Sequence, residues 1–384
     1  MDGSVRIGRL FRIPILIHYT FLIVIPLFAW IIGSEIKDTA GLIGKLFAVT
    51  IDTSVITSGY MPWILGVVVA LGLFAGVLIH ELAHSIVALH KGIAINNITL
   101  MIFGGIAEME EGTPDPKVEL PMALVGPVAS LFVGIICCVL VYTAPSVTPD
   151  PGMQGVWIFA FGYLGMLNII LCAFNLIPAF PMDGGRVLRA WLATRMPLHR
   201  ATKIAADIGK GFAILFAIVA IIPMFYNPNF FNPMLLLIAL FIYIGANTES
   251  SAVKYSHLLQ NVTVGDMMST PVITVPSTMP LSTVISMMYT SKHLGFPVVE
   301  RDTLVGMVTL ADVNRNSSID REAMQVRDIM TRDLVTLPPE APVIDALRIM
   351  SAQDFGRIPV VQDGKILGIV TRTDILKVAE LKQV

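Results

Sequence analysis

Long apolar stretches alternate with short polar segments from the N-terminus to about residue 247. An α-helix needs about 20 apolar residues to cross the hydrocarbon core of a bilayer. Several stretches approach or exceed this length, and the first and last of them are the shortest. They cover residues 18–32, 63–90, 121–142, 156–179, 204–224 and 232–247. The pattern predicts a polytopic α-helical membrane protein with about six transmembrane helices.

The pattern changes after Asn247, where apolar and polar residues alternate and helical segments lie between. This part contains an internal repeat, which aligns without a gap when the sequence is shifted by 62 positions. Residues 264–268 align with 326–330, and residues 306–312 align with 368–374. The sequence therefore predicts a transmembrane domain at 1–247, a linker at 248–260, and two α/β repeats at 261–322 and 323–384.

Composition agrees with a membrane protein. Hydrophobic residues make up 55% of the chain and charged residues only 14%. The mean hydropathy is +0.75, far above that of a soluble globular domain. The net charge of −2 gives no basic field for binding nucleic acid. The cysteines Cys137, Cys138 and Cys172 all lie in apolar stretches, and their spacing matches neither a zinc-binding pair nor a disulfide framework.

Basic residues indicate how the predicted spans are oriented, because lysine and arginine gather in cytoplasmic loops. The segments after the third and fifth spans contain neither. The first stretch lacks a signal-peptide cleavage site, so we expect it to be retained. Basic residues do occur before the first span, between the fourth and fifth, and after the last: Arg6, Arg9, Arg12, Arg186, Arg189, Arg195, Arg200, Lys203 and Lys254. We therefore expect a multi-pass protein of the cell membrane with its N-terminus and its soluble tail in the cytoplasm.

Ionisable residues interrupt the second apolar stretch at His80, Glu81 and His84. Positions i and i+4 of a helix share a face, so both imidazoles can bind one metal ion. Glu81 projects from nearly the same side, where it could accept a proton from a water molecule that the metal activates. The alternative is two histidines hydrogen-bonded inside a helix bundle, but ionisable residues at membrane depth are costly and usually mark a function. The motif predicts zinc chemistry inside a membrane.

A catalytic zinc ion takes three protein ligands and leaves one position open for water. Two residues at membrane depth could supply the third ligand: His18, at the start of the first stretch, and Asp183, just after the fourth. Asp183 is the stronger candidate. Pro178 and Pro181 break the helix before it, and irregular backbone at membrane depth is tolerated only where it lines protein or water. The alternative is that Asp183 caps the helix that follows.

Two motifs together resemble one protein family. His-Glu-Leu-Ala-His at 80–84 and Asn-Leu-Ile-Pro-Ala-Phe-Pro-Met-Asp-Gly-Gly-Arg at 175–186 look like the signature of the site-2 protease family of intramembrane zinc metalloproteases. Phe103-Gly104-Gly105 is similar to a family loop beside the active site, and residues 126–130 are similar to its GPxxN/S element. The resemblance covers roughly residues 6–205. Met182 stands where the family usually has leucine, a conservative exchange.

The resemblance implies roles for five residues. His80, His84 and Asp183 would bind one zinc ion per chain, and Glu81 would activate water as the general base. Asn175 would donate a hydrogen bond to the oxyanion or to the substrate backbone. The alternative for Asn175 is a helix–helix hydrogen bond.

The resemblance also implies that the substrate is a transmembrane helix of another membrane protein. Such a helix satisfies its own backbone hydrogen bonds, so it must unwind locally before a peptide bond can be attacked. The segment at 103–106 would then offer an extended edge to which the unwound chain adds as a strand.

Each soluble repeat ends in Gly-x-Val-Thr-x-x-Asp, and the pair resembles tandem CBS domains over residues 262–378. In such modules the threonine and aspartate hold the phosphate and ribose of an adenosine ligand. The resemblance implies that Thr309, Asp312, Thr371 and Asp374 bind an adenine nucleotide. The alternative is that both aspartates only cap helices. By analogy the tail would regulate the membrane domain, and a homodimer through the CBS domains is expected.

Two further hypotheses come from other functional classes: a CBS-gated transporter or channel, and a non-catalytic membrane sensor. A transport path would show repeated halves or rows of polar pore-lining groups, and the predicted spans show neither. The sensor hypothesis conflicts with the intact Glu81. We therefore expect an enzyme, a zinc metalloendopeptidase.

Overall fold

The computed structural model describes residues 3–102, 104–109, 115–315 and 324–381. The chain divides into two compact units, Met1–Ser251 and Ala252–Val384, and each has hydrophobic cores of its own. Residues 248–259 of the predicted linker are helical, because they form the end of α9 (Pro233–Leu259).

Five helices in the described part of the chain are long and apolar enough to cross a membrane. The first predicted span corresponds to α1 (Phe21–Ser34), which has 14 residues and contains Pro26. At 1.5 Å per residue α1 is about 21 Å long, shorter than the hydrocarbon core of about 30 Å. The polytopic helical class is confirmed, whereas a sixth span stays a prediction. The five helices are α3 (Met61–His90), α4 (Pro116–Val141), α6 (Pro151–Asn175), α8 (Leu198–Ile221) extended by η1 (Ile222–Phe225), and α9.

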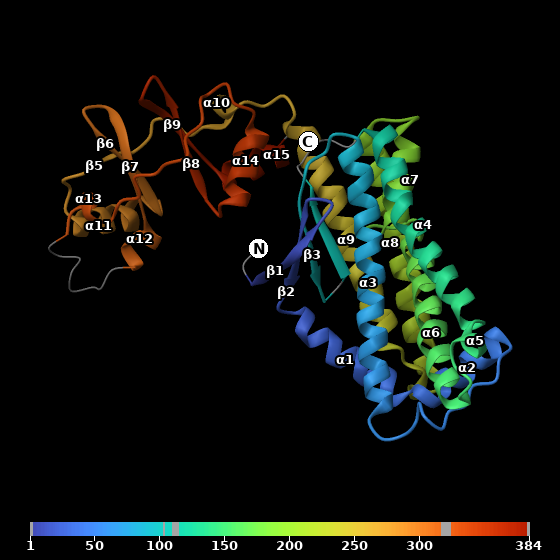
Figure 1. The fold of residues 1–384 in the computed structure, drawn as a ribbon. Coiled ribbons are helices and arrows are strands. Elements are labelled where there is room, and N and C mark those ends of the chain that lie inside the picture. Colours follow the sequence, from blue (N-terminus) through green and yellow to red (C-terminus); the bar gives the residue numbers. More distant parts are fainter. Residues whose placement is uncertain (1–2, 103, 110–114, 316–323, 382–384) are drawn as a thin grey trace. The chain divides into compact units, whose positions relative to one another are not determined.

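Glycine lets these helices approach closely. A Cβ on Gly165 of α6 would lie 3.2 Å from the backbone oxygen of Gly134 in α4. Close backbone packing of this kind drives helix association in lipid, where the hydrophobic effect cannot. Figure 1 shows α3, α4 and α6 side by side. The short helices that join the long ones are α2 (Ile36–Phe47), α5 (Ala144–Val147), α7 (Asp183–Ala193) and η2 (Pro228–Phe230).

A four-stranded sheet packs beside α3. Its strands are β1 (Ser4–Leu10), β2 (Ile13–His18), β3 (Ile95–Met101) and β4 (Gly104–Met109), in that spatial order. The pair β2–β3 is parallel, and the other two pairs are antiparallel. A buried apolar cluster of Ile13, Ile15, Ile98 and Leu82 joins the sheet to α3. Because β4 pairs only with β3 in the described structure, it forms one edge of the sheet.

The N-terminal hairpin corrects the predicted start of the first span. His18 is the last residue of β2, where it pairs with Ser4, and the apolar helix begins only at Phe21. The sequence pattern gave no separate signal for this strand, because its apolar residues run directly into those of α1.

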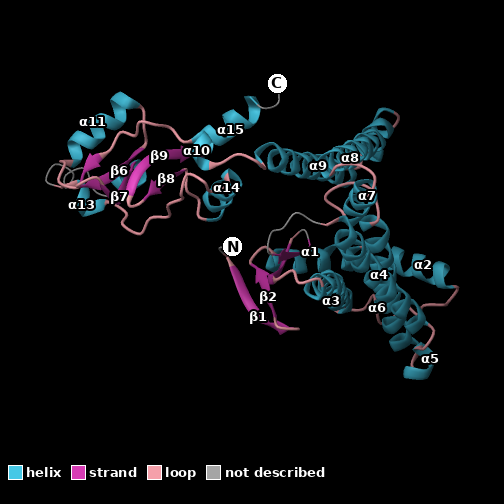
Figure 2. Ribbon diagram, turned by 90° about the horizontal axis from the view of Figure 1, so that it is seen from above, coloured by secondary structure: helices cyan, strands magenta, loops and turns pink. Residues whose placement is uncertain are grey.

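The second unit contains one five-stranded sheet with the strand order β5-β6-β7-β9-β8. Figure 2 shows its strands with helices packed around them. The register pairs Gly295 with Thr309 in the first repeat and Arg357 with Thr371 in the second, which confirms the 62-residue repeat. The strands are β5 (Val275–Pro276), β6 (Gly295–Glu300), β7 (Thr303–Thr309), β8 (Arg357–Gln362) and β9 (Lys365–Thr371). The helices are α10 (Val264–Met267), α11 (Leu281–Ser291), α12 (Leu310–Asn314), α13 (Val326–Ile329), α14 (Val343–Ala352) and α15 (Arg372–Leu381).

The two repeats exchange their N-terminal segments. Val262 and Val264, which begin the first repeat, are buried with Val343 and Val360 of the second. Val326, which begins the second repeat, is buried in the core of the first. Each repeat therefore contributes residues to the core of the other.

Candidate active site

Two buried imidazoles face each other on one side of α3. His80 and His84 are 5% and 7% exposed, and their Nε2 atoms lie 3.1 Å apart. The four-residue spacing places them one helical turn apart, as the sequence predicts. Their rings are close to perpendicular, at 76°, so both Nε2 atoms can be directed to one point.

Asp183 completes the cluster from a different part of the chain. Its Oδ2 lies 3.0 Å from Nε2 of His80 and 3.1 Å from Nε2 of His84. Asp183 is the first residue of α7, and the residue that precedes the helix as its N-cap is Met182. The carboxylate thus points to the histidines, and the structure offers no support for the helix-cap alternative.

The outer nitrogens of both imidazoles are held by α4. Nδ1 of His84 lies 2.6 Å from the backbone oxygen of Met122, and Nδ1 of His80 lies 2.9 Å from the hydroxyl of Ser130. A carbonyl oxygen can only accept, so Nδ1 of His84 carries the hydrogen and Nε2 keeps its lone pair for a ligand. The helix α4 therefore sets the orientation of the donor atoms.

Glycine at position 126 of the same helix leaves room for the donors. A Cβ there would lie 2.1 Å from Nε2 of His84 and 2.7 Å from Nε2 of His80. The sequence motif drew attention to Gly126 and Ser130, but the contacts of both were not predicted from it.

The donor set fits a zinc ion. The Nε2 atoms of His80 and His84 and a carboxylate oxygen of Asp183 lie within 4.8 Å of one another, and all three residues are buried. Tetrahedral zinc with ligand bonds of about 2.0–2.1 Å holds its ligand atoms roughly 3.4 Å apart. The observed separations of 3.0 to 3.1 Å are close to this value. These residues could hold a zinc ion with a fourth position left for water.

Glu81 follows His80 on α3 and contacts the edge strand β4 of the sheet. A Cβ on Gly105 of β4 would lie only 2.5 Å from Cγ of Glu81, so the side chain of Glu81 packs against the strand. The sequence predicted an extended segment at 103–106, but it did not predict that this segment contacts Glu81. Phe103 lies outside the described residues.

Two other candidates have local partners instead. The side-chain amide of Asn175 donates to the backbone oxygen of Leu171, 3.0 Å away in its own helix. Nδ1 of His18 lies 2.9 Å from the hydroxyl of Thr20. In the described part of the chain, His18 is not among the donor groups that cluster.

The four candidate nucleotide-binding residues form two similar pairs in the second unit. The hydroxyl of Thr309 donates to Oδ2 of Asp312 at 2.7 Å, and that of Thr371 donates to Oδ2 of Asp374 at 2.6 Å. In return the backbone N–H of each aspartate donates to the threonine hydroxyl. Each pair thus caps the helix that follows its strand, and a role of the four residues in nucleotide binding stays a prediction.

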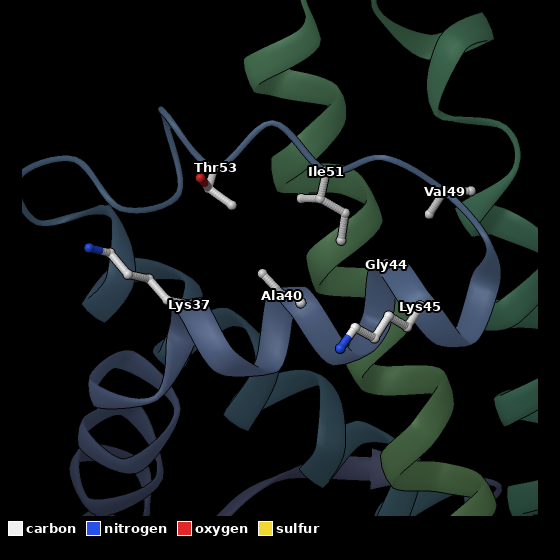
Figure 3. Close-up of a pocket in the computed structure, with 8 residues that line it drawn as sticks. Lys37, Ala40, Gly44, Lys45, Val49, Ile51 and Thr53 are labelled. Atoms are coloured by element: carbon white, nitrogen blue, oxygen red, sulfur yellow. The ribbon is translucent and has the colours of Figure 1, made fainter.

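A surface hollow of about 400 Å³ lies between α2 and residues 49–53 (Figure 3). Lys37 and Lys45 line it. A Cβ on Gly155, near the start of α6, would lie 2.2 Å from the backbone oxygen of Asp52, whereas Asp183 follows the other end of that helix. The hollow is therefore at the opposite end of α6 from the donor cluster and takes no part in it.

Comparison with known proteins identifies the family. Residues 68–150 and 148–218 match peptidase family M50, and residues 264–318 and 326–380 match the CBS domain. The zinc metalloprotease MJ0392 of Methanocaldococcus jannaschii is 32% identical over 386 residues, covering 100% of this chain and 99% of the relative. The chain belongs to peptidase family M50. This M50 peptidase is a zinc metalloprotease of the site-2 protease type with a C-terminal CBS pair.

Two solved structures are similar to different parts of the chain. The site-2 protease from Methanocaldococcus jannaschii is 33% identical, covers 64% of this chain and 95% of its own, and has a TM-score of 0.40. CBSX2, solved in complex with AMP, is 28% identical, covers 32% of this chain and 98% of its own, and has a TM-score of 0.29. Family membership favours a peptidase and argues against the transporter or channel hypothesis. It also agrees with the apolar helices of a multi-pass membrane protein.

Proposed function

We propose that this M50 peptidase hydrolyses peptide bonds within or near transmembrane helices of other membrane proteins. The observation that carries the proposal is the buried donor cluster of His80, His84 and Asp183, with Glu81 next to His80 on α3. We assign one zinc ion per chain to the cluster. When bound, zinc would polarise the scissile carbonyl and lower the pKa of a water molecule toward neutrality.

The protein's own groups would move the proton and hold the substrate. Glu81 accepts the proton of the attacking water and later delivers it to the leaving amine. Asn175 donates a hydrogen bond to the oxyanion or to the substrate backbone, for which it must release the oxygen of Leu171. This exchange is possible because the bond to Leu171 is within one helix and costs little to replace.

The edge strand β4 presents the substrate. A transmembrane helix that unwinds locally exposes backbone N–H and C=O groups, which an unpaired strand edge can satisfy. The contact between Gly105 and Glu81 supports this role, because a chain added to β4 would lie close to the general base.

The CBS pair regulates the membrane domain by binding an adenine nucleotide. The expected ligands are Thr309 and Asp312 in one repeat and Thr371 and Asp374 in the other, both at the end of a strand. We further propose that the N-terminus and the CBS tail are cytoplasmic and that the CBS domains form a homodimer. The proposed boundaries are a transmembrane domain at 1–247, a linker at 248–260, and CBS repeats at 261–322 and 323–384.

The first test measures zinc in the detergent-purified full-length protein. We expect about one zinc per chain in the wild type and much less in Asp183→Ala, because a carboxylate ligand is lost. Asp207→Ala is the matched control, since Asp207 is an exposed aspartate that pairs with Lys203 on α8. A folded wild type that contains no zinc and takes up none would contradict the proposal.

A second variant separates chemistry from metal binding. Glu81→Gln should keep its zinc but lose cleavage of a single-span model substrate by about 10²–10⁴-fold, the usual contribution of general acid–base catalysis. Cleavage products are identified by mass spectrometry. Wild-type cleavage by this variant would exclude Glu81 as the base.

A further inference from the structure

An ion cluster with two buried members joins the helices α7, α4 and α9. Nε of Arg189 donates to Oε1 of Glu119 at 2.8 Å, and its Nη2 donates to the same oxygen. Nη1 of Arg189 donates to Oε1 of Glu249. Arg189 is 5% exposed and Glu119 is 1% exposed. We call these three residues the Arg189 cluster.

The Arg189 cluster connects the two elements that build the metal site. Arg189 lies on α7, which begins with Asp183. Glu119 lies on α4, three, seven and eleven residues before Met122, Gly126 and Ser130, so all four occupy one face of that helix. The ion pair therefore fixes the helix of the carboxylate ligand to the helix that orients both histidines.

Arg189 also contacts the loop that leads into Asp183. Its guanidinium carbon lies 5.1 Å from the ring centre of Phe180, which is 1% exposed. A cation over an aromatic face at this distance is a favourable contact. Arg189 thus holds both the loop before Asp183 and the helix after it.

The helix α9 holds the same loop from another direction. A Cβ on Gly245 would lie 2.6 Å from Cδ of Pro181, so the two backbones are in close contact. Glu249, which accepts from Arg189, is four residues further along and lies on the same face of α9. The Asp183 segment is therefore bounded by α4 and by α9, and Arg189 bonds to both.

Stability alone does not explain a buried ion cluster. Well-packed apolar residues of similar volume often stabilise a protein as well or better. An arginine differs from them in its planar fork, which fixes the direction of each partner. A zinc site needs such directional control, because ligand distances must hold to within about 0.2 Å.

We propose that Arg189 is a positioning residue that holds Asp183 in place for zinc by fixing α7 to α4 and α9. This inference rests on the proposed function, because it assigns a supporting residue to the same site. Arg189 contacts none of the three donor residues in the described structure, so its effect is exerted through the backbone of the Asp183 segment.

The test compares variants by zinc affinity, measured by competition with a chelator, and by thermal midpoint. Arg189→Met should raise the zinc Kd by about tenfold or more, as supporting residues of metal ligands usually do. Arg189→Lys should recover part of the loss, since it keeps the charge but not the fork. The absorption spectrum of bound Co²⁺ should change in both variants, because it reports the ligand geometry.

A double variant separates positioning from folding. Arg189→Met with Glu119→Gln removes both buried charges, so its thermal midpoint should return toward that of the wild type. Its zinc Kd should stay raised, because nothing directs α7 onto α4. Arg195→Met is the control: Arg195 stacks on Trp191 at 4.6 Å and is exposed, so both readouts should remain unchanged.

The outcomes distinguish this inference from the proposed function. If the wild type binds zinc and the double variant has the same zinc Kd, the positioning role is overturned and the proposed function stays intact. If Arg189→Met fails to fold, the lysine and double variants still give the comparison. A wild type that binds no zinc overturns the proposed function and this inference together.

Discussion

At the scale of single residues, the donor cluster depends on groups that would not bind the metal themselves. The oxygen of Met122 fixes the hydrogen of His84 on Nδ1, which leaves Nε2 free to coordinate. The absence of a side chain at Gly126 leaves the volume in which both Nε2 atoms meet. Ligand identity alone is therefore insufficient, since any side chain at position 126 would occupy the place of the metal.

Gly126→Ala should abolish zinc binding. The added methyl group would lie 2.1 Å from Nε2 of His84, so the imidazole must turn away. Gly211→Ala is the control: Gly211 lies within a helix, α8, and a Cβ there would meet no atom within 4 Å. We expect zinc stoichiometry near zero for the first variant and near one for the second. Equal zinc content in both would mean that the site tolerates a side chain at position 126.

At the scale of secondary structure, the sheet gives the helical site an extended neighbour. The strand β4 has a partner on one side only among the described strands, and it passes directly beside Glu81. Edge strands of this kind readily pair with another chain. Under the proposed function, a transmembrane substrate would exchange its helical hydrogen bonds for strand hydrogen bonds beside Glu81.

Strand addition predicts that inhibition by an extended apolar peptide depends on the register of its N–H groups. Only one edge of the peptide faces β4, so N-methylation of alternate residues should have two distinct effects. Methylation on the facing edge should weaken inhibition by about tenfold or more, the cost of two or more hydrogen bonds. Methylation on the other edge should have little effect. Inhibition constants that are the same for both registers would argue against strand addition.

At the scale of the whole molecule, the features that local patterns encode were predicted from the sequence. The apolar helices, the 62-residue repeat and the convergence of His80, His84 and Asp183 each follow from spacing or from a motif. The N-terminal sheet was missed because β2 pairs with β3 across some eighty residues, and no local period records that pairing. Arg189 was missed because it is one of several basic residues in a segment whose charge was attributed to the orientation of the protein in the membrane. Its hydrogen bond to Glu119 is visible only in the structure.

The CBS pair offers the last prediction, because the chain contains its own control for helix capping. Thr263 and Asp266 form the same reciprocal cap as Thr309 and Asp312, with hydroxyl–carboxylate distances of 2.8 and 2.7 Å. Only the second pair follows a strand that ends in Gly-x-Val-Thr. Changing either aspartate to asparagine removes the carboxylate of the capping box but leaves the N-cap threonine in place.

Nucleotide affinity should separate these two variants. Asp312→Asn, like Asp374→Asn in the other repeat, should weaken binding of AMP or ATP to the full-length protein by about tenfold or more, since a hydrogen bond to a charged group is lost. Asp266→Asn should leave the affinity unchanged. Isothermal titration calorimetry measures the three variants beside the wild type. Equal affinities in all of them would reduce Asp312 and Asp374 to helix caps, whereas a wild type that binds neither nucleotide would remove the nucleotide from the proposed regulation.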